Sequence, residues 1–136
     1  MAGISGKEIS MIVVCVDNTP IMLQSLRENA EAAFPQADVQ AFLTERSALN
    51  YAKKAGCDVL LCEINPPRLE GLFLAEEIKK LNSKVNIVFV TVCSESEHAK
   101  AVMRLRPSGY LTKEATNDQI LYELQNLRYP IPSVSI

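Results

Sequence analysis

The sequence predicts an α/β protein in which helices cover both faces of one parallel sheet. Short apolar runs rich in Val, Ile and Leu alternate with longer segments whose apolar residues recur every three or four positions. The runs are continuously apolar, which is typical of strands that are covered on both faces. The chain has 136 residues, 48% of them hydrophobic, which is enough for one domain with a sizeable core.

Composition and charge argue against several classes of protein. Lys and Arg number 14 and Asp and Glu 16, so the net charge of −2 disfavours a strongly basic nucleic-acid surface. The longest apolar runs, Met11–Val16 and Ile87–Val90, are far too short to span a membrane. No signal peptide is visible, and we expect a cytoplasmic location. The four cysteines form no CxxC pair and are expected to be reduced core thiols: Cys15, Cys57, Cys62 and Cys93.

Five apolar runs predict the strands, and each run stops at polar residues. In chain order they are Ile12–Val16, Val39–Phe42, Val59–Cys62, Asn86–Val90 and Tyr110-Leu111. The segment Ile64–Gly71, which contains two consecutive prolines, predicts a loop after the third strand.

Capping residues and apolar spacing predict the five helices that alternate with these strands. Residues that favour helix N-termini precede four of the helices: Thr19 before Pro20, Thr44, Ser94 with Glu97, and Thr116 with Gln119. Pro35 and Gly56 predict the ends of the first two helices. We expect each helix to turn an apolar face inward, formed by Leu23, Leu26, Ala30 and Ala33; Leu49 and Ala52; Leu72, Ala75, Ile78 and Leu81; Ala99, Val102 and Met103; and Ile120, Leu124 and Leu127.

Five alternating strands and helices with right-handed crossovers leave few topologies. The commonest is a flavodoxin-like (βα)5 doubly wound parallel sheet with strand order 2-1-3-4-5. In such sheets ligands bind outside the carboxyl ends of the strands, between the first and third strands. The polar residues that leave the strand ends are Asp17, Asn18, Glu63, Thr91 and Lys113. We therefore expect these side chains to converge in one crevice.

At these residues the chain resembles the receiver domain of bacterial response regulators. The resemblance covers about Ile12–Leu127 and rests on five short pieces that occur in order at receiver-like spacing. They are the acidic turn Val16-Asp17-Asn18, Glu63, the loop Ile64–Gly71, Thr91, and Gly109–Lys113. Each piece is weak alone, but the five together are specific.

The resemblance implies a role for each of these residues. In this family an Asp after the third strand accepts a phosphoryl group, and Mg²⁺ is held by that Asp, an acidic pair and a carbonyl of the following loop. A Thr or Ser and a Lys bind the phosphoryl oxygens. The corresponding phosphoacceptor site is Glu63, Thr91 and Lys113. The corresponding metal ligands are Asp17, Asn18, Glu63 and Asn65. Thr91 and Tyr110 match the switch residues.

The chain departs from the family pattern at the centre of the site. Glu63 stands where the phosphoacceptor Asp is expected, Asn18 replaces the second acid, and Val92 and Glu114 replace the usual small residue and proline. Asn18 removes a negative charge from a site for a cation that prefers carboxylates. Glu63 adds about 1.5 Å of bond length to a nucleophile whose reaction depends on positioning. We expect a weakened or lost phosphoacceptor, a weak Mg²⁺ site at most, no other cofactor and no enzyme activity.

Glu63 has two interpretations. Its longer carboxylate meets Lys113 and mimics part of the phosphorylated state, or it is a tolerated polar residue in a decayed site. Because a half-buried charge needs a partner, we expect the Lys113 ammonium within salt-bridge distance of Asp17 or Glu63, with Glu63 the first choice. A Lys113 side chain that points to solvent would favour the decayed site.

Three functions remain open. The first is a pseudo-receiver, a signalling module of a response regulator that works through protein contacts without phosphorylation. The second is a phosphorylatable receiver of a two-component phosphorelay that controls transcription. The third is a flavodoxin-like cofactor-binding protein, which the glycine-free, acidic turn Asp17–Pro20 disfavours because its charge repels phosphate.

The resemblance also predicts partners and boundaries. The expected partners are a histidine kinase and an output domain on this or another chain, with a homodimer through residues 95–127. We expect neither direct nucleic-acid binding by this domain nor a membrane contact. Residues 1–10 are expected to form a flexible leader, residues 11–128 the receiver-like domain, and residues 129–136 a linker stub or tail.

Overall fold

Five parallel strands form one sheet in the order β2-β1-β3-β4-β5, as the sequence predicts. The fold is seen in a computed structural model, which describes residues 11–66, 68–92 and 98–131. The strands are β1 (Ile12–Val16), β2 (Asp38–Phe42), β3 (Val59–Cys62), β4 (Asn86–Thr91) and β5 (Gly109–Thr112). All neighbouring strands pair in parallel, so their carboxyl ends lie along one edge of the sheet.

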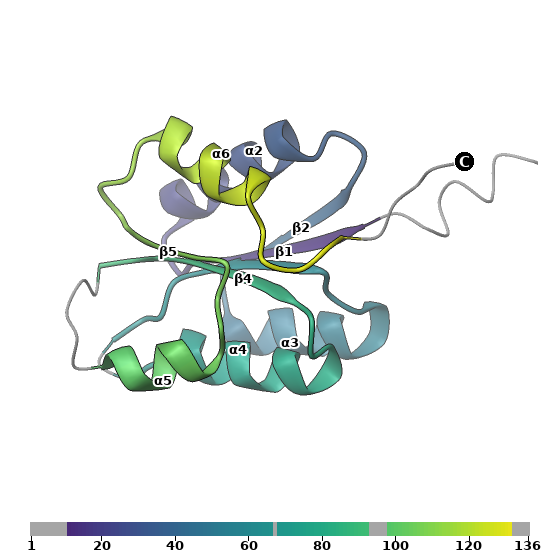
Figure 1. Ribbon diagram of the computed structural model, residues 1–136, viewed down its shortest axis with the longest axis vertical. Helices are drawn as coiled ribbons and strands as arrows, with labels where there is room; N and C mark the ends of the chain where they lie inside the picture. Colours follow the sequence, from purple (N-terminus) through teal and green to yellow (C-terminus); the bar gives the residue numbers. More distant parts are fainter. Residues whose placement is uncertain (1–10, 67, 93–97, 132–136) are drawn as a thin grey trace, which may run out of the picture.

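Helices cover both faces of this sheet (Figure 1). They are α2 (Pro20–Ala33), α3 (Glu45–Ala55), α4 (Glu70–Leu81), α5 (Ala99–Arg104) and α6 (Asn117–Gln125). One face carries α2 and α6, and the other carries α3, α4 and α5. Successive strand residues point to opposite faces, so Val13 and Cys15 of β1 pack under α2 and α6 while Val14 and Val16 pack toward α3 and α4. The predicted doubly wound α/β fold is confirmed.

Two of the predicted helix caps and one predicted helix end are confirmed. The Thr44 hydroxyl oxygen accepts a hydrogen bond from the Ser47 N–H at 3.2 Å. Thr116 and Gln119 form a complete capping box at the start of α6. Gly56 ends α3 with φ at +91°, a conformation that an L side chain adopts only with strain.

The first predicted cap is different in the structure. Thr19 precedes α2, but its side chain makes no capping hydrogen bond. Instead the Thr19 N–H donates to Asp17 Oδ1 at 2.8 Å, so the carboxylate of Asp17 fixes the turn between β1 and α2. This contact ties a candidate site residue to the local fold.

Three details of the predicted helices need correction or lie outside the described part. The side chain of Leu81 is 50% exposed and that of Met103 70% exposed, so neither belongs to an inward face. Met103 is exposed because α5 packs on the core through the adjacent residue Val102, which turns Met103 away from the core. The proposed Ser94–Glu97 capping box lies outside the described residues.

Helix α4 begins at Glu70, so Gly71 lies inside the helix rather than in the preceding loop. A Cβ atom at Gly71 would lie 1.6 Å from the carbonyl oxygen of Glu63, and the Gly71 N–H donates to the Ile64 carbonyl at 2.9 Å. Only glycine allows the start of α4 to press this closely on the backbone that follows β3. The start of α4 therefore fixes the backbone of Glu63.

Three of the four cysteines are buried free thiols, as the sequence predicts: Cys15, Cys57 and Cys62. Burial raises the pKa of the Cys15 thiol to about 12 and also raises the pKa of Cys57 and Cys62. Cys93 lies outside the described residues. Among the helices described, none combines the length and the apolarity needed to cross a bilayer.

Candidate functional site

The parallel register brings four predicted site residues to one edge of the sheet. Val16 of β1 pairs with Cys62 of β3, so Asp17 and Glu63 emerge side by side. The Lys113 N–H donates to the Thr91 carbonyl at 3.0 Å, which continues the pairing of β4 with β5 past Thr112. The predicted convergence of Asp17, Glu63, Thr91 and Lys113 is therefore observed.

The carboxylate of Glu63 is the centre of the site. The residue is only 5% exposed, and both of its carboxylate oxygens meet hydrogen-bond donors. Oε2 accepts from the Asn65 N–H at 2.8 Å and from the Thr91 hydroxyl. Oε1 accepts from the Val92 N–H at 3.2 Å and lies 3.1 Å from the Lys113 ammonium nitrogen. One carboxylate thus meets four donors, which come from the loop after β3, from the end of β4 and from the residue after β5.

Lys113 lies between two buried carboxylates. Its Nζ is 3.1 Å from Asp17 Oδ2 and 3.1 Å from Glu63 Oε1. The prediction that the Lys113 ammonium pairs with at least one of them is confirmed, and it pairs with both. Asp17 is 2% exposed, and its other oxygen holds the Thr19 N–H. Two carboxylates this close repel each other unless a cation lies between them, and Lys113 supplies that cation.

The pKa of Lys113 reflects a balance between its burial and its contacts with the two carboxylates. Burial by itself lowers the pKa of the ammonium, but hydrogen bonds to Asp17 and Glu63 and their negative charges outweigh burial and raise it above its usual value. The Lys113 side chain is 21% exposed, so solvent screens the pair in part. Lys113 therefore stays cationic throughout the neutral range.

Asn18 and Asn65 form a neighbouring amide cluster instead of joining the carboxylates. Asn18 Oδ1 accepts from Asn65 Nδ2, and Asn18 Nδ2 donates to the Leu43 carbonyl at 2.5 Å. Asn65 Nδ2 also donates to Glu45 Oε2 and Glu70 Oε1, each at 3.0 Å. Asn65 has a φ of 68°, in the left-handed region, where Asn is tolerated better than most residues. The backbone N–H of Asn65 therefore binds Glu63, while the Asn65 side chain belongs to the amide cluster.

Sequence reasoning missed Glu45 and Glu70. Glu45 follows Thr44 just after β2, so the strand-end argument, applied to β2 as well, would have found it. Glu70 lies in the segment that was predicted to be loop, and only the observed start of α4 orients it toward Asn65.

The four predicted metal ligands do not fit Mg²⁺ in this arrangement. Magnesium requires oxygen ligands in near-ideal octahedral geometry. Here the oxygens of Asp17 and Glu63 face N–H, O–H and ammonium donors, and the Asn65 carbonyl, the expected loop ligand, accepts from the Leu69 N–H at 3.0 Å. An entering cation would have to compete with these donors for the same oxygens.

Tyr110 lies on β5 opposite Phe89 of β4 and is half-buried. The two rings meet edge to face, with centroids 6.2 Å apart and an interplanar angle of 61°. Such contacts stabilise aromatic pairs beyond their buried area. The predicted switch aromatic is thus packed on the core beneath α3, α4 and α5.

Comparison with known proteins identifies the family. The response regulator receiver domain family matches residues 13–125. The chain is 29% identical to the chemotaxis protein CheY of Halobacterium salinarum over 74% of this chain and 82% of that protein. It is 26% identical to the nitrate/nitrite response regulator NarP of Escherichia coli over 80% of this chain and 51% of NarP. The response regulatory domain of MrkE from Klebsiella pneumoniae superposes with a TM-score of 0.74 at 27% identity, covering 86% of this chain and 94% of that domain.

The chain belongs to the response regulator receiver domain family. It is a receiver domain of two-component signalling, built on the flavodoxin-like fold. The chain spans most of the halobacterial CheY but about half the length of NarP.

Replacing Lys113 by Met tests the charge balance of the site. The variant leaves two buried carboxylates without their cation, so we expect the free energy of unfolding to fall by about 3 kcal/mol at pH 7. The deficit should shrink as the pH rises from 7 past the unfolded pKa of lysine, because the raised pKa of Lys113 means its contribution is complete below that value and is lost as the pH rises through the folded pKa.

Urea unfolding of both proteins across this pH range measures the difference. Lys80→Met is the matched control, because Lys80 forms a solvent-exposed pair with Glu77 at 2.8 Å and its loss should change the free energy of unfolding little. A Lys113→Met deficit as small as that of the control, or one independent of pH, would contradict the charge balance described here.

Proposed function

We propose that this chain is a pseudo-receiver, a signalling module that Glu63 holds in a phosphate-independent state and that acts through protein contacts. The observation that carries the proposal is the set of donors on the Glu63 carboxylate. These are the Thr91 hydroxyl, the Lys113 ammonium and the N–H groups of Asn65 and Val92.

The resemblance to receivers gives this donor set its meaning. In the family a Thr or Ser and a Lys bind the phosphoryl oxygens, and here the corresponding Thr91 and Lys113 both bind the side chain of Glu63. The extra methylene of Glu, about 1.5 Å, moves the carboxylate outward to these donors. Glu63 carries one negative charge where a phosphoryl group carries about two, so the mimicry is partial.

The same contacts argue against phosphoryl transfer to Glu63. A nucleophile needs a free electron pair aligned with the incoming phosphorus, and a phosphoryl group in transfer needs cationic stabilisation. The oxygens of Glu63 already accept hydrogen bonds, and Lys113 is already paired with two carboxylates. We therefore infer that Glu63 does not accept a phosphoryl group, and the proposed module acts as neither an enzyme nor a cofactor-binding protein.

Membership of the receiver family favours this proposal over a cofactor-binding protein. Between mimicry and decay, the position of Lys113 supports mimicry, because the ammonium lies on Glu63 rather than in solvent. The phosphorylatable receiver remains the alternative that the following experiment separates.

Incubation with acetyl phosphate and Mg²⁺, followed by intact-mass measurement, tests the proposal. We expect the wild-type protein and Glu63→Gln to gain no phosphoryl group. Glu63→Asp restores the residue type that accepts the phosphoryl group in this family and shortens the side chain away from Thr91 and Lys113, so we expect this variant to be labelled. A phosphoryl adduct on Glu63 of the wild-type protein would overturn the proposal.

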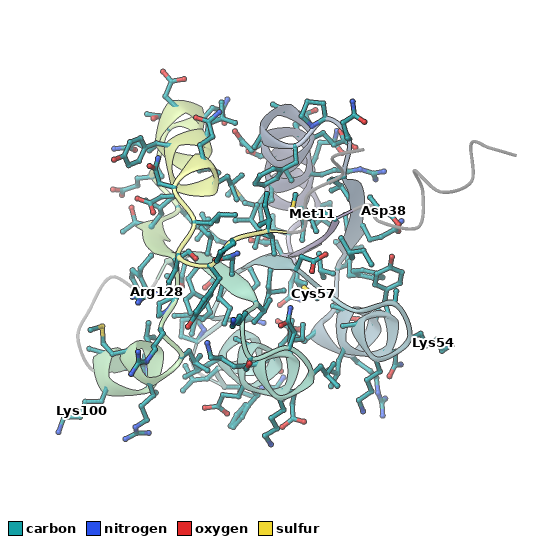
Figure 2. The ribbon with its side chains drawn as sticks, turned by 45° about the vertical axis from the view of Figure 1, so that its right-hand side comes forward. Met11, Asp38, Lys54, Cys57, Lys100 and Arg128 are labelled. Carbon is teal, nitrogen blue, oxygen red and sulfur yellow. The ribbon has the colours of Figure 1, made fainter. Side chains whose placement is uncertain are left out.

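The partners proposed for this module are a histidine kinase, an output domain on this or another chain, and a second copy of the chain. The surface proposed for the second copy is formed by α5, β5 and α6, within the predicted range 95–127. It exposes residues of both charge signs and two large apolar side chains: Lys100, Met103, Arg104, Asp118 and Tyr122. Figure 2 shows Lys100 projecting outward from α5. Basic residues on α5 complement the acidic residue on α6 of a partner copy. Residues 95–97 lie outside the described part.

Sedimentation at tens of micromolar tests this surface. We expect a dimer for the wild-type protein and mainly monomer for Arg104→Glu, because the charge reversal places two acids opposite each other. Arg46→Glu on α3, an exposed charge reversal away from this surface, should leave the dimer intact. A monomeric wild-type protein, or equal effects of the two variants, would remove the support for this dimer.

A further inference from the structure

The chain remains attached to the domain beyond the end of α6. Helix α6 ends at Gln125, and residues 128–131 then lie against the edge of the sheet opposite to Glu63, where β4 and β5 begin. In Figure 1 this yellow segment descends from α6 to the sheet and turns toward the start of β1. Ile131 packs against the same apolar cluster as Met11, the residue that precedes β1. We call residues 128–131 the strap.

The buried side chain of Asn86 binds the strap as a neighbouring strand would. Asn86 is the first residue of β4 and is 1% exposed. Its Nδ2 donates to the Tyr129 carbonyl at 2.9 Å, and its Oδ1 accepts from the Tyr129 N–H at 2.8 Å. A buried amide is costly unless its donor and acceptor are both satisfied, and here one backbone residue satisfies both. The strap therefore satisfies the donor and the acceptor of the buried Asn86 side chain, and Asn86 in turn holds the strap in place.

Ser108 and Lys79 complete this contact. The Ser108 hydroxyl donates to Asn86 Oδ1 at 2.8 Å and accepts from the Arg128 N–H at 3.0 Å. Lys79 of α4 lies 5.1 Å from the centroid of the Tyr129 ring, within the range of a cation–π contact. Arg128 Nε also donates to the Pro107 carbonyl at 3.4 Å. Arg128 and Tyr129 of the strap are thus held by groups from α4, from β4 and from the two residues that precede β5.

We propose that the strap is an anchor that sets where the onward chain leaves the domain, with Asn86 and Ser108 as its clamp. Docked, the strap directs the chain to the start of β1, at the end of the sheet remote from Glu63. Released, the strap's four residues add about 14 Å of reach at about 3.4 Å per extended residue. A segment that follows Ile131 would be held near the start of β1 while the strap is docked. It would reach a larger volume around the domain once the strap is released. This inference is independent of the state of Glu63.

Amide hydrogen exchange and limited trypsin digestion of the full chain test the proposal. In the wild-type protein we expect the Tyr129 amide to be protected and the peptide bond after Arg128 to be cleaved slowly. Ser108→Ala removes one clamp group without emptying the core, so the protection of Tyr129 should fall about tenfold, the effect of one lost hydrogen bond. Cleavage after Arg128 should accelerate in parallel, while the Val92 amide at the Glu63 site keeps its protection. Ser83→Ala, in the exposed loop before β4, is the matched control and should change neither readout.

Asn86→Ala should abolish the protection of Tyr129, and the Ser108→Ala result decides the question if Asn86→Ala fails to fold. A wild-type Tyr129 amide that exchanges as fast as an unstructured one would overturn the proposal. So would a Ser108→Ala variant that leaves Tyr129 protected, or one that loses protection equally at Tyr129 and Val92, because the second result means general loosening rather than release of the strap.

Discussion

The arrangement of this domain depends on one electrostatic constraint, the placement of a single ammonium between two buried carboxylates. Asp17 and Glu63 leave adjacent strands side by side, and Lys113 lies 3.1 Å from each. Without a cation the two carboxylates would repel each other in a poorly solvated site. Lys113 reaches them only because β5 pairs with β4 in one register, and a slip by one residue would turn its side chain to the other face. The register of β5 against β4 therefore also determines that a cation lies between the two carboxylates.

Glu63 connects this constraint to the proposed function. Its carboxylate gathers a hydroxyl, two backbone N–H groups and the ammonium, and its backbone is fixed by the close approach of Gly71. A phosphoryl group is added and removed, whereas a glutamate side chain is permanent. On the account proposed here, the signalling state is then fixed by the chain itself and changes only through its partners.

The sequence predicts the strands, the strand order and the residues at the strand ends, because continuous apolar runs and caps such as Thr116 with Gln119 are local signals. It also predicts the pairing of Lys113, because charge balance follows from position alone. It does not predict that Met103 is exposed, since that depends on which side chains of α5 face the core. The amide cluster of Asn18 and Asn65 with Glu45 was also missed, because it depends on loop conformation, including the positive φ of Asn65. The contact of Asn86 with Tyr129 joins positions 43 residues apart and leaves no periodic signal.

A double-mutant cycle on Glu63 and Lys113 tests the central claim most directly. The free energies of unfolding of the wild-type protein, Glu63→Gln, Lys113→Met and the double variant, all measured in urea at pH 7, give the coupling between the two side chains. If the ammonium and the carboxylate support each other as described, the coupling energy is about 1–3 kcal/mol and favourable. A coupling below about 0.3 kcal/mol would show that the two side chains act independently, and would contradict the account.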